Sequence, residues 1–154
     1  MHALAGPGVL LGLQNPVKDD TFSNNRARGA LIVAEMSSSD NLLSHEYTRK
    51  CVEMFKKYSD ENLEVPPIGF VAQSMIMEGP NFIQMMPGVS LKSKGDSLGQ
   101  NYVSVEDAIF KRGADIIIVG RGITSCNNDV AMIQNAKEYQ QLGWNSYLKR
   151  CAQN

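Results

Sequence analysis

The residues best suited to chemistry lie where apolar segments give way to glycines and polar side chains. Arg121 stands between two glycines directly after the apolar run 114–119. Glycine lets the backbone approach a bound group closely, and the planar guanidinium fork matches the oxygens of a phosphate. Upstream, an amide and a phenol that could reach the same anion belong to Gly99-Gln100-Asn101-Tyr102. The pattern predicts an anion-binding site, and the alternative is an ordinary strand-to-helix turn with a solvated arginine.

Four short apolar segments that could position these groups predict β-strands. They are Ala30–Glu35, Pro67–Val71, Phe82–Met86 and Asp115–Val119. The last is rich in β-branched residues and does not alternate, which is typical of a parallel strand buried on both faces.

Three segments show helical spacing. His45–Tyr58 places apolar side chains on one face, so it predicts a helix that covers the sheet. Val103–Lys111 predicts a shorter helix with Ser104 as its cap and acidic residues in its first turn. Asn128–Arg150 predicts a long closing helix, and the inner face we expect for it consists of Ile133, Ala136, Trp144, Tyr147 and Leu148.

The connection between the second and third predicted strands is too short for an ordinary crossover helix. Residues 73–81 contain Gly79-Pro80, which would interrupt a helix. We therefore expect an irregular loop that lies over the site.

The order of these elements suits part of a (β/α)8 barrel. In that fold a phosphate site is commonly built by the loops after the seventh and eighth strands. A complete barrel needs roughly 250 residues, whereas this chain has 154. We therefore expect an α/β fold with parallel strands that forms half of such a barrel. The open edges of its sheet predict self-association, as a homodimer, or pairing with a complementary barrel half.

Composition excludes several classes of function. The net charge of −1, with both signs interspersed, argues against a nucleic-acid partner. No apolar run is long enough to span a membrane, and the opening segment lacks the basic head of a signal peptide. Three widely spaced cysteines form no metal-ligand pattern, and the two histidines have no ligand-like neighbours. We expect a cytoplasmic protein with reduced thiols, without metal or cofactor.

Several motifs occur along this chain in the same order as in one known protein family, so the resemblance is specific. The chain resembles the C-terminal half of the orotidine 5′-monophosphate decarboxylase family, the domain also found in uridine monophosphate synthases. The resemblance covers nearly the whole sequence, from the end of the fourth barrel strand through the eighth helix, and implies one partial domain over residues 1–154. It is carried by His2–Leu13, Leu31–Ser38, Glu46-Tyr47-Thr48, Gly69-Phe70-Val71, Pro87-Gly88-Val89, Gly95–Tyr102 and Ala114–Ile123.

The resemblance implies roles for individual residues. Ser37, after the fifth barrel strand, would hydrogen-bond the pyrimidine ring, and Pro87 would line the base pocket. Residues that would hold the phosphate are Gln100, Tyr102, Gly120 and Arg121. The bound nucleotide would be orotidine monophosphate or uridine monophosphate. Each residue also has a structural alternative: Ser37 as a turn cap, Pro87 as a strand stop and Tyr102 as a packed core residue.

The sequence departs from the family in two places. Met86 stands where family members usually carry threonine, which affects the packing expected for the base pocket. The family's catalytic Asp-x-Lys-x-x-Asp array is absent, and Val17-Lys18-Asp19-Asp20 has neither its spacing nor its position. No catalytic residue is therefore assigned.

Three hypotheses follow. The favoured one is a carboxy-lyase by family that keeps the substrate-binding half and is inactive alone. The second is a non-catalytic protein that binds a phosphorylated ligand or pairs with a homologue. The third is another phosphate-binding barrel enzyme, such as a pentulose-phosphate epimerase relative, and the absence of metal-ligand histidines counts against it.

Overall fold

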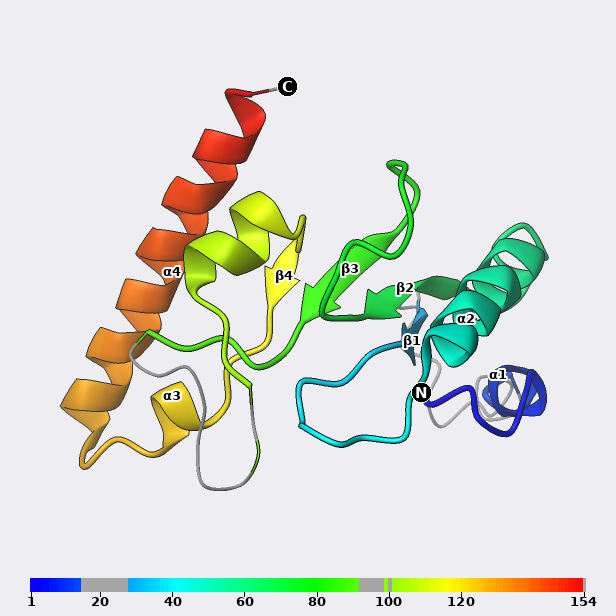
Figure 1. Cartoon of the computed structure of the whole chain (residues 1–154), viewed down its shortest axis with the longest axis horizontal. Helices are drawn as coiled ribbons and strands as arrows, with labels where there is room; N and C mark the ends of the chain where they lie inside the picture. Colours follow the sequence, from blue (N-terminus) through cyan, green and yellow to red (C-terminus); the bar gives the residue numbers. More distant parts are fainter. Residues whose placement is uncertain (15–27, 92–98, 100, 154) are drawn as a thin grey trace.

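A four-stranded parallel sheet forms the centre of the chain (Figure 1). The computed structural model describes residues 1–14, 28–91, 99 and 101–153. The strands pair in chain order and are β1 (Ala30–Val33), β2 (Pro67–Val71), β3 (Ile83–Met86) and β4 (Ile116–Ile117). The prediction of parallel strands in chain order is confirmed, and the arrangement is that of half a (β/α)8 barrel.

Helical elements cover the sheet and its two ends. They are α1 (Gly8–Gly12), α2 (His45–Tyr58), η3 (Asp107–Lys111, a π-helical turn), α3 (Arg121–Thr124) and α4 (Asp129–Cys151). The α2 helix packs on β1 and β2, whereas η3 packs between β4 and α4. Figure 1 shows α4 toward one end of the long axis, with α1 and α2 at the other.

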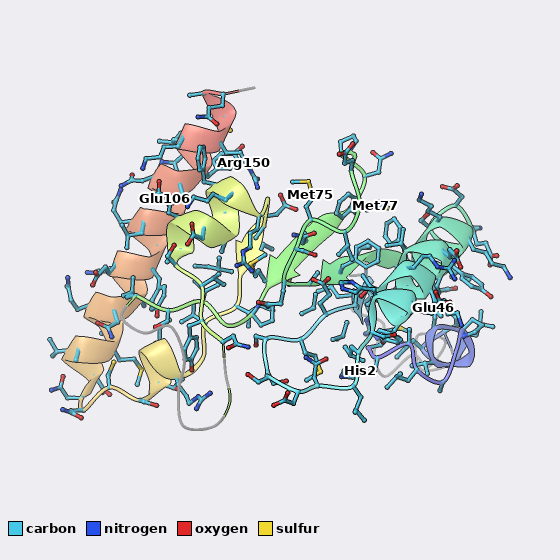
Figure 2. The ribbon with its side chains drawn as sticks, in the orientation of Figure 1. His2, Glu46, Met75, Met77, Glu106 and Arg150 are labelled. Atoms are coloured by element: carbon cyan, nitrogen blue, oxygen red, sulfur yellow. The ribbon has the colours of Figure 1, made fainter. Side chains whose placement is uncertain are left out.

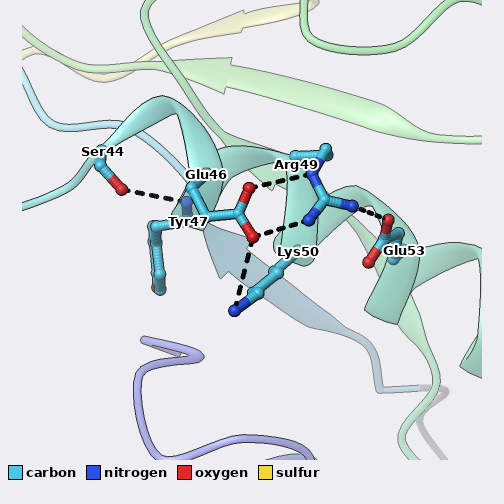
Figure 3. Close-up of polar contacts among 6 residues, drawn as sticks. All are labelled: Ser44, Glu46, Tyr47, Arg49, Lys50 and Glu53. Carbon is cyan, nitrogen blue, oxygen red and sulfur yellow. Dashed lines mark hydrogen bonds and ion pairs between the residues drawn. The ribbon is translucent and has the colours of Figure 1, made fainter.

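The α2 helix begins where Ser44 caps it, because the Ser44 hydroxyl accepts a hydrogen bond of 3.2 Å from the backbone N–H of Tyr47. On its solvent face Arg49 bridges Glu46 and Glu53 (Figure 3). The hydrogen bond from Arg49 lowers the pKa of Glu46. On the opposite face Cys51, Phe55 and Tyr58 are buried against the sheet.

Three aromatic rings form the centre of the core below α2. The Phe55 ring lies 4.9 Å from that of Phe70 and 6.3 Å from that of Phe82, between centroids. Ile32 of β1 and Ala72 after β2 are fully buried in the same cluster. Burial of this apolar area holds α2 on the β1 and β2 side of the sheet.

A second core joins β3 to η3 and α4. Met86 is fully buried there with Val105 and Ala108, so its thioether fills this core. Ser104 caps the helical segment as predicted, since its hydroxyl accepts a bond of 3.0 Å from Asp107 N–H. Arg150 on α4 donates to the carbonyl oxygens of Ile109 and Ala114, which fastens α4 to the end of η3 (Figure 2).

The connection between β2 and β3 is irregular, as predicted, but it does not lie over the site along its whole length. Its first residues stay at the carboxyl end of β2, and the rest crosses the outer face of the sheet. There Ile76 and Met77 pack against the Phe55 core, and Met75 contacts Gly113 before β4 (Figure 2). This segment takes the place that a crossover helix would fill.

Two predictions about burial are wrong. Strand β4 is restricted to two residues, and Ile116 and Ile118 are exposed, so this strand is not buried on both faces. On α4, the expected inner-face residues Ile133, Trp144, Tyr147 and Leu148 are exposed, while Tyr139 and Ser146 are buried. Both errors lie at the same end of the sheet, where β4 pairs only with β3 among the residues described.

Candidate functional site

The residues after β1 and β3 are joined by the segment around Asn101. Asn101 donates its backbone N–H to the carbonyl oxygen of Ser37 at 3.0 Å. The amide N–H of Ser39 donates to Gly99 O at 2.8 Å, and Val103 N–H donates to Gly88 O at 2.8 Å. Because carboxyl ends of parallel strands share one edge of the sheet, these bonds build a single wall from segments far apart in sequence.

Gly88 is the point where this wall is tightest. A Cβ at Gly88 would lie 2.6 Å from Cβ of Ser37, 3.1 Å from its Oγ and 2.8 Å from Asn101 O. Its φ of +73° also lies in the left-handed region that favours glycine. Glycine at this position therefore brings the Ser37 side chain directly against the backbone that follows Pro87.

Glu35 and Gln73 brace the same edge from β1 and β2. The Gln73 side chain donates from Nε2 to Pro87 O at 2.8 Å, and its backbone N–H donates to Glu35 Oε2 at 2.7 Å. Ser74 adds backbone and hydroxyl bonds to the same carboxylate. The bond from Gln73 holds the carbonyl group of Pro87 in place. Glu35 accepts hydrogen bonds from Gln73 and Ser74, so its role here is structural.

Gly120 and Arg121 follow β4 at the same edge of the sheet. Gly120 is exposed, and no heavy atom lies within 4 Å of the place where its Cβ would stand, so its backbone is open to close approach. Arg121, also exposed, begins α3. The neighbouring Gly122 serves packing instead, because the Tyr139 hydroxyl occupies the space of a Cβ there. Only the first of the two glycines therefore suits the anion contact expected from the sequence.

Tyr139 links this turn to the segment after β3. Its hydroxyl accepts a hydrogen bond of 3.2 Å from Leu91 N–H while packing against Gly122. Asn135, one turn earlier on α4, donates to Gly122 O at 3.0 Å. The α4 helix thereby sets the position of the turn that carries Arg121.

Five of the six predicted site residues lie at the carboxyl edge of the sheet, and the sixth is not among the described residues. Ser37 and Pro87 lie in one wall, and Tyr102 follows Asn101 in the same wall. Gly120 and Arg121 share the sheet edge and connect to the β3 side through Tyr139. Gln100 lies outside the described residues.

Sequence reasoning missed the residues that assemble the wall, namely Glu35, Gln73, Gly88, Asn101 and Tyr139. Glu35 and Gln73 follow apolar strand segments, which is a usable signal because functional groups gather at strand ends. The contact of Tyr139 with Gly122 has no such local signal. It depends on where α4 packs.

The described part of the chain holds neither a metal-ligand cluster nor a membrane-spanning helix. Over residues 1–14, 28–91, 99 and 101–153, no cluster of three or more His, Cys, Asp or Glu is placed to hold a metal ion. Across the same ranges, no helix combines the length and apolar character needed to cross a membrane.

Comparison with known proteins gives concordant matches. A family model described as Orotidine 5′-phosphate decarboxylase / HUMPS family matches residues 1–136. An orotidine 5′-phosphate decarboxylase of Pichia kudriavzevii is 45% identical over 152 residues, which are 97% of this chain and 54% of that protein. The corresponding protein of Saccharomyces cerevisiae is 39% identical over 155 residues, with 99% of this chain and 54% of the relative covered.

A relative with a different name matches in the same way. A uridine 5′-monophosphate synthase of Bos taurus is 40% identical over 151 residues, which are 98% of this chain and 28% of that protein. The chain thus spans about half the length of the curated decarboxylases it matches. The family match covers most of the sequence, and the parallel sheet has the strand order that a barrel of this kind requires. On these grounds the chain belongs to the orotidine 5′-phosphate decarboxylase / HUMPS family.

Proposed function

We propose that residues 1–154 form the part of a decarboxylase-type barrel that binds the base and the phosphate of a pyrimidine nucleotide. On this proposal the chain runs from the end of the fourth barrel strand through the eighth helix, and β1 to β4 are the fifth to eighth strands. The bound nucleotide is orotidine monophosphate or its product, uridine monophosphate. The names of the matched relatives support this substrate class.

The observation that carries the proposal is the contact of Ser37 with Gly88. It places a hydroxyl beside the backbone that follows Pro87, at the carboxyl edge of the sheet. There the Ser37 side chain binds the pyrimidine ring and Pro87 lines the base pocket.

The phosphate is held at the other side of the same edge. Arg121 supplies the charge, and the open backbone of Gly120 supplies close approach. Tyr102 and Gln100 complete the group of phosphate ligands in this proposal. The wall that contains Asn101 brings Tyr102 to the carboxyl edge of the sheet.

This chain does not decarboxylate by itself under the proposal. Loss of CO2 from orotidine monophosphate leaves a carbanion with no adjacent electron sink, so charge must be stabilised electrostatically and a proton delivered from a positioned group. The sequence has no Asp-x-Lys-x-x-Asp array that could supply these functions. The phosphate site contributes binding energy at a distance from the reacting carbon. A cytoplasmic location is part of the proposal, and the free thiols of Cys51, Cys126 and Cys151 support it.

The alternative function is that of a non-catalytic protein that binds a phosphorylated ligand of another kind. The exposed Arg121 favours any phosphate monoester, whereas the contact between Ser37 and Gly88 favours a base beside the phosphate. Inorganic phosphate and a sugar phosphate are therefore the informative competitors.

Calorimetric titration of the purified chain with uridine monophosphate, uridine and ribose 5-phosphate tests the proposal. We expect the strongest binding for the monophosphate, because only that ligand engages both ends of the site. Equal affinity for ribose 5-phosphate would favour the alternative. A parallel assay for CO2 release should give no turnover above background, and turnover that persists after repurification would contradict the assignment of an inactive half.

A further inference from the structure

A single peptide group after β2 lies between two charged side chains. Its carbonyl oxygen, on Gln73, accepts a hydrogen bond of 3.0 Å from Nη1 of Arg112. Its N–H, on Ser74, donates to Oε2 of Glu35 at 2.8 Å. Glu35 follows β1 and Arg112 precedes β4, so the two charges come from distant parts of the chain. Together the cation and the anion orient one peptide dipole, and each charge-assisted bond strengthens the other.

The segment that carries Arg112 is itself fixed to the sheet. Gln84, a buried residue of β3, donates from Nε2 to the carbonyl oxygen of Arg112 at 3.2 Å. Met75 packs on the next residue, because a Cβ at Gly113 would lie 2.5 Å from the methyl carbon of Met75. This segment therefore supports the connection after β2 at two places, through a hydrogen bond and through an apolar contact.

The network ends at Pro87, directly after β3. Nε2 of Gln73 donates to Pro87 O at 2.8 Å. The bonds thus run from Gln84 of β3 through Arg112 and Gln73, and return to the end of the same strand. In a closed set of bonds of this kind, the position of each partner depends on the others.

We propose that Arg112 is a positioning residue for the base end of the site, and that it acts through Gln73 on Pro87. Arg112 precedes β4, whereas the site lies at the carboxyl edge of the sheet, so its effect on the ligand is indirect. It holds the peptide group between Gln73 and Ser74, and the Gln73 side chain then holds the carbonyl group of Pro87. This inference rests on the proposed function, in which the base lies against Pro87.

The ratio of two affinities separates this role from a purely structural one. Uridine monophosphate and ribose 5-phosphate share the sugar and the phosphate and differ in the base. Loss of stability, or of the phosphate contact, should weaken binding of both ligands alike, whereas a displaced Pro87 should weaken binding of the nucleotide alone. The ratio of the two dissociation constants, measured by titration calorimetry, therefore reports on the base end.

Replacing Arg112 by methionine removes the cation and keeps an apolar side chain. We expect Arg112→Met to lower the preference for uridine monophosphate over ribose 5-phosphate by at least about fivefold, because the Gln73 peptide loses its hydrogen bond. Arg112→Lys should recover part of the preference, since an ammonium group can still donate to that carbonyl oxygen. Lys111→Met is the matched control. It makes the same change at the neighbouring residue, whose exposed ammonium pairs with Asp107, and should leave the preference unchanged.

A second variant keeps the test decisive if Arg112→Met does not fold. Gln73→Met removes the bond to Pro87 O and leaves the backbone bonds of residue 73 to Glu35 and Arg112 in place. It should lower the preference for the nucleotide by a similar factor. Where both variants fold, their effects should not add in the double variant, because both act through one bond to Pro87.

The outcomes distinguish this inference from the proposed function. A wild-type chain that binds both ligands equally would contradict the proposed function, and the role of Arg112 would fall with it. A wild-type chain that prefers uridine monophosphate, with the same preference in folded Arg112→Met or in Gln73→Met, would overturn the role of Arg112 alone.

Discussion

The hydroxyl of Tyr139 fills the space in which a side chain at Gly122 would begin, and it accepts a hydrogen bond from Leu91 N–H at 3.2 Å. A single residue of α4 therefore meets both the turn after β4 and the segment after β3. This contact makes the position of Arg121 dependent on the packing of α4. It also explains Gly122 without reference to an anion.

Replacing Gly122 by alanine should disturb this contact. The new Cβ collides with the Tyr139 hydroxyl, so either α4 or the turn must shift, and we expect a loss of about 1–3 kcal/mol in the free energy of unfolding. Urea unfolding measures the loss. Gly12→Ala is the comparison, because no atom lies within 4 Å of its Cβ position and its backbone is helical, so it should cost much less.

Removing the hydroxyl should relieve the collision. Tyr139→Phe alone loses the bond from Leu91, which costs about 1 kcal/mol. In the Gly122→Ala background the same change also removes the clashing atom, so the double variant should be more stable than the sum of the single losses predicts. Strict additivity in the cycle would show that the two residues are not in contact.

The contact of Gly88 with Ser37 leads to a prediction about ligand binding. Gly88→Ala introduces left-handed strain and pushes Ser37 away, so uridine monophosphate affinity should fall at least about tenfold. Gly6→Ala is the matched control. Gly6 has φ +77° but no atom within 4 Å of its Cβ position, so this variant carries the strain alone. If both variants bound the nucleotide equally well, Ser37 would not belong to the site.

Local sequence patterns predicted a strand well where that strand lies between two others in the sheet, and they predicted helix caps well. Pro67–Val71 has the bounds of β2, and it lies between two paired strands. Ser104 and Asn128 cap their helices through bonds that depend only on nearby residues. Hydrophobic spacing also identified the buried face of α2, because the sheet below that helix is complete.

The same patterns failed at the end of the sheet that carries β4. Apolar side chains such as Trp144 were assigned to an inner face because hydrophobicity alone cannot tell which surface covers them. Tyr139 is buried instead, since it faces η3 and the turn after β4. Within the site, Ser37 and Pro87 followed from resemblance. Their contact through Gly88 is a tertiary relationship that spacing along the chain does not encode.

Tyr47 predicts a pH dependence of stability. Its hydroxyl donates to Val33 O at 3.0 Å and accepts from Ala3 N–H at 2.9 Å, and burial raises its pKa. The folded state therefore holds the phenolic proton more tightly than the unfolded state. Its contribution to stability is complete below the ordinary tyrosine pKa of about 10 and is lost as the pH rises from there through the folded-state pKa.

Comparison with Tyr47→Phe isolates this effect from other groups that titrate in alkali. The variant should be less stable by about 1–2 kcal/mol near neutral pH, because two backbone groups lose their partner. The difference between the two proteins should shrink above about pH 10. Urea unfolding at a series of pH values measures it, and a constant difference would mean that Tyr47 has the same pKa in the folded and unfolded states.

Titration calorimetry of single variants shows whether Arg121 holds a nucleotide phosphate. Arg121→Ala should weaken uridine monophosphate binding more than Ser37→Ala does, since a charge-assisted contact is worth about 1.5–3 kcal/mol and a neutral one about 1. Uridine should bind poorly and equally to wild type and Arg121→Ala. Arg49→Ala, which removes the same charge from the solvent face of α2, controls for net charge and should bind as wild type does. If Arg121→Ala binds the monophosphate as tightly as wild type, Gly120-Arg121-Gly122 is only a turn and the phosphate is not held there.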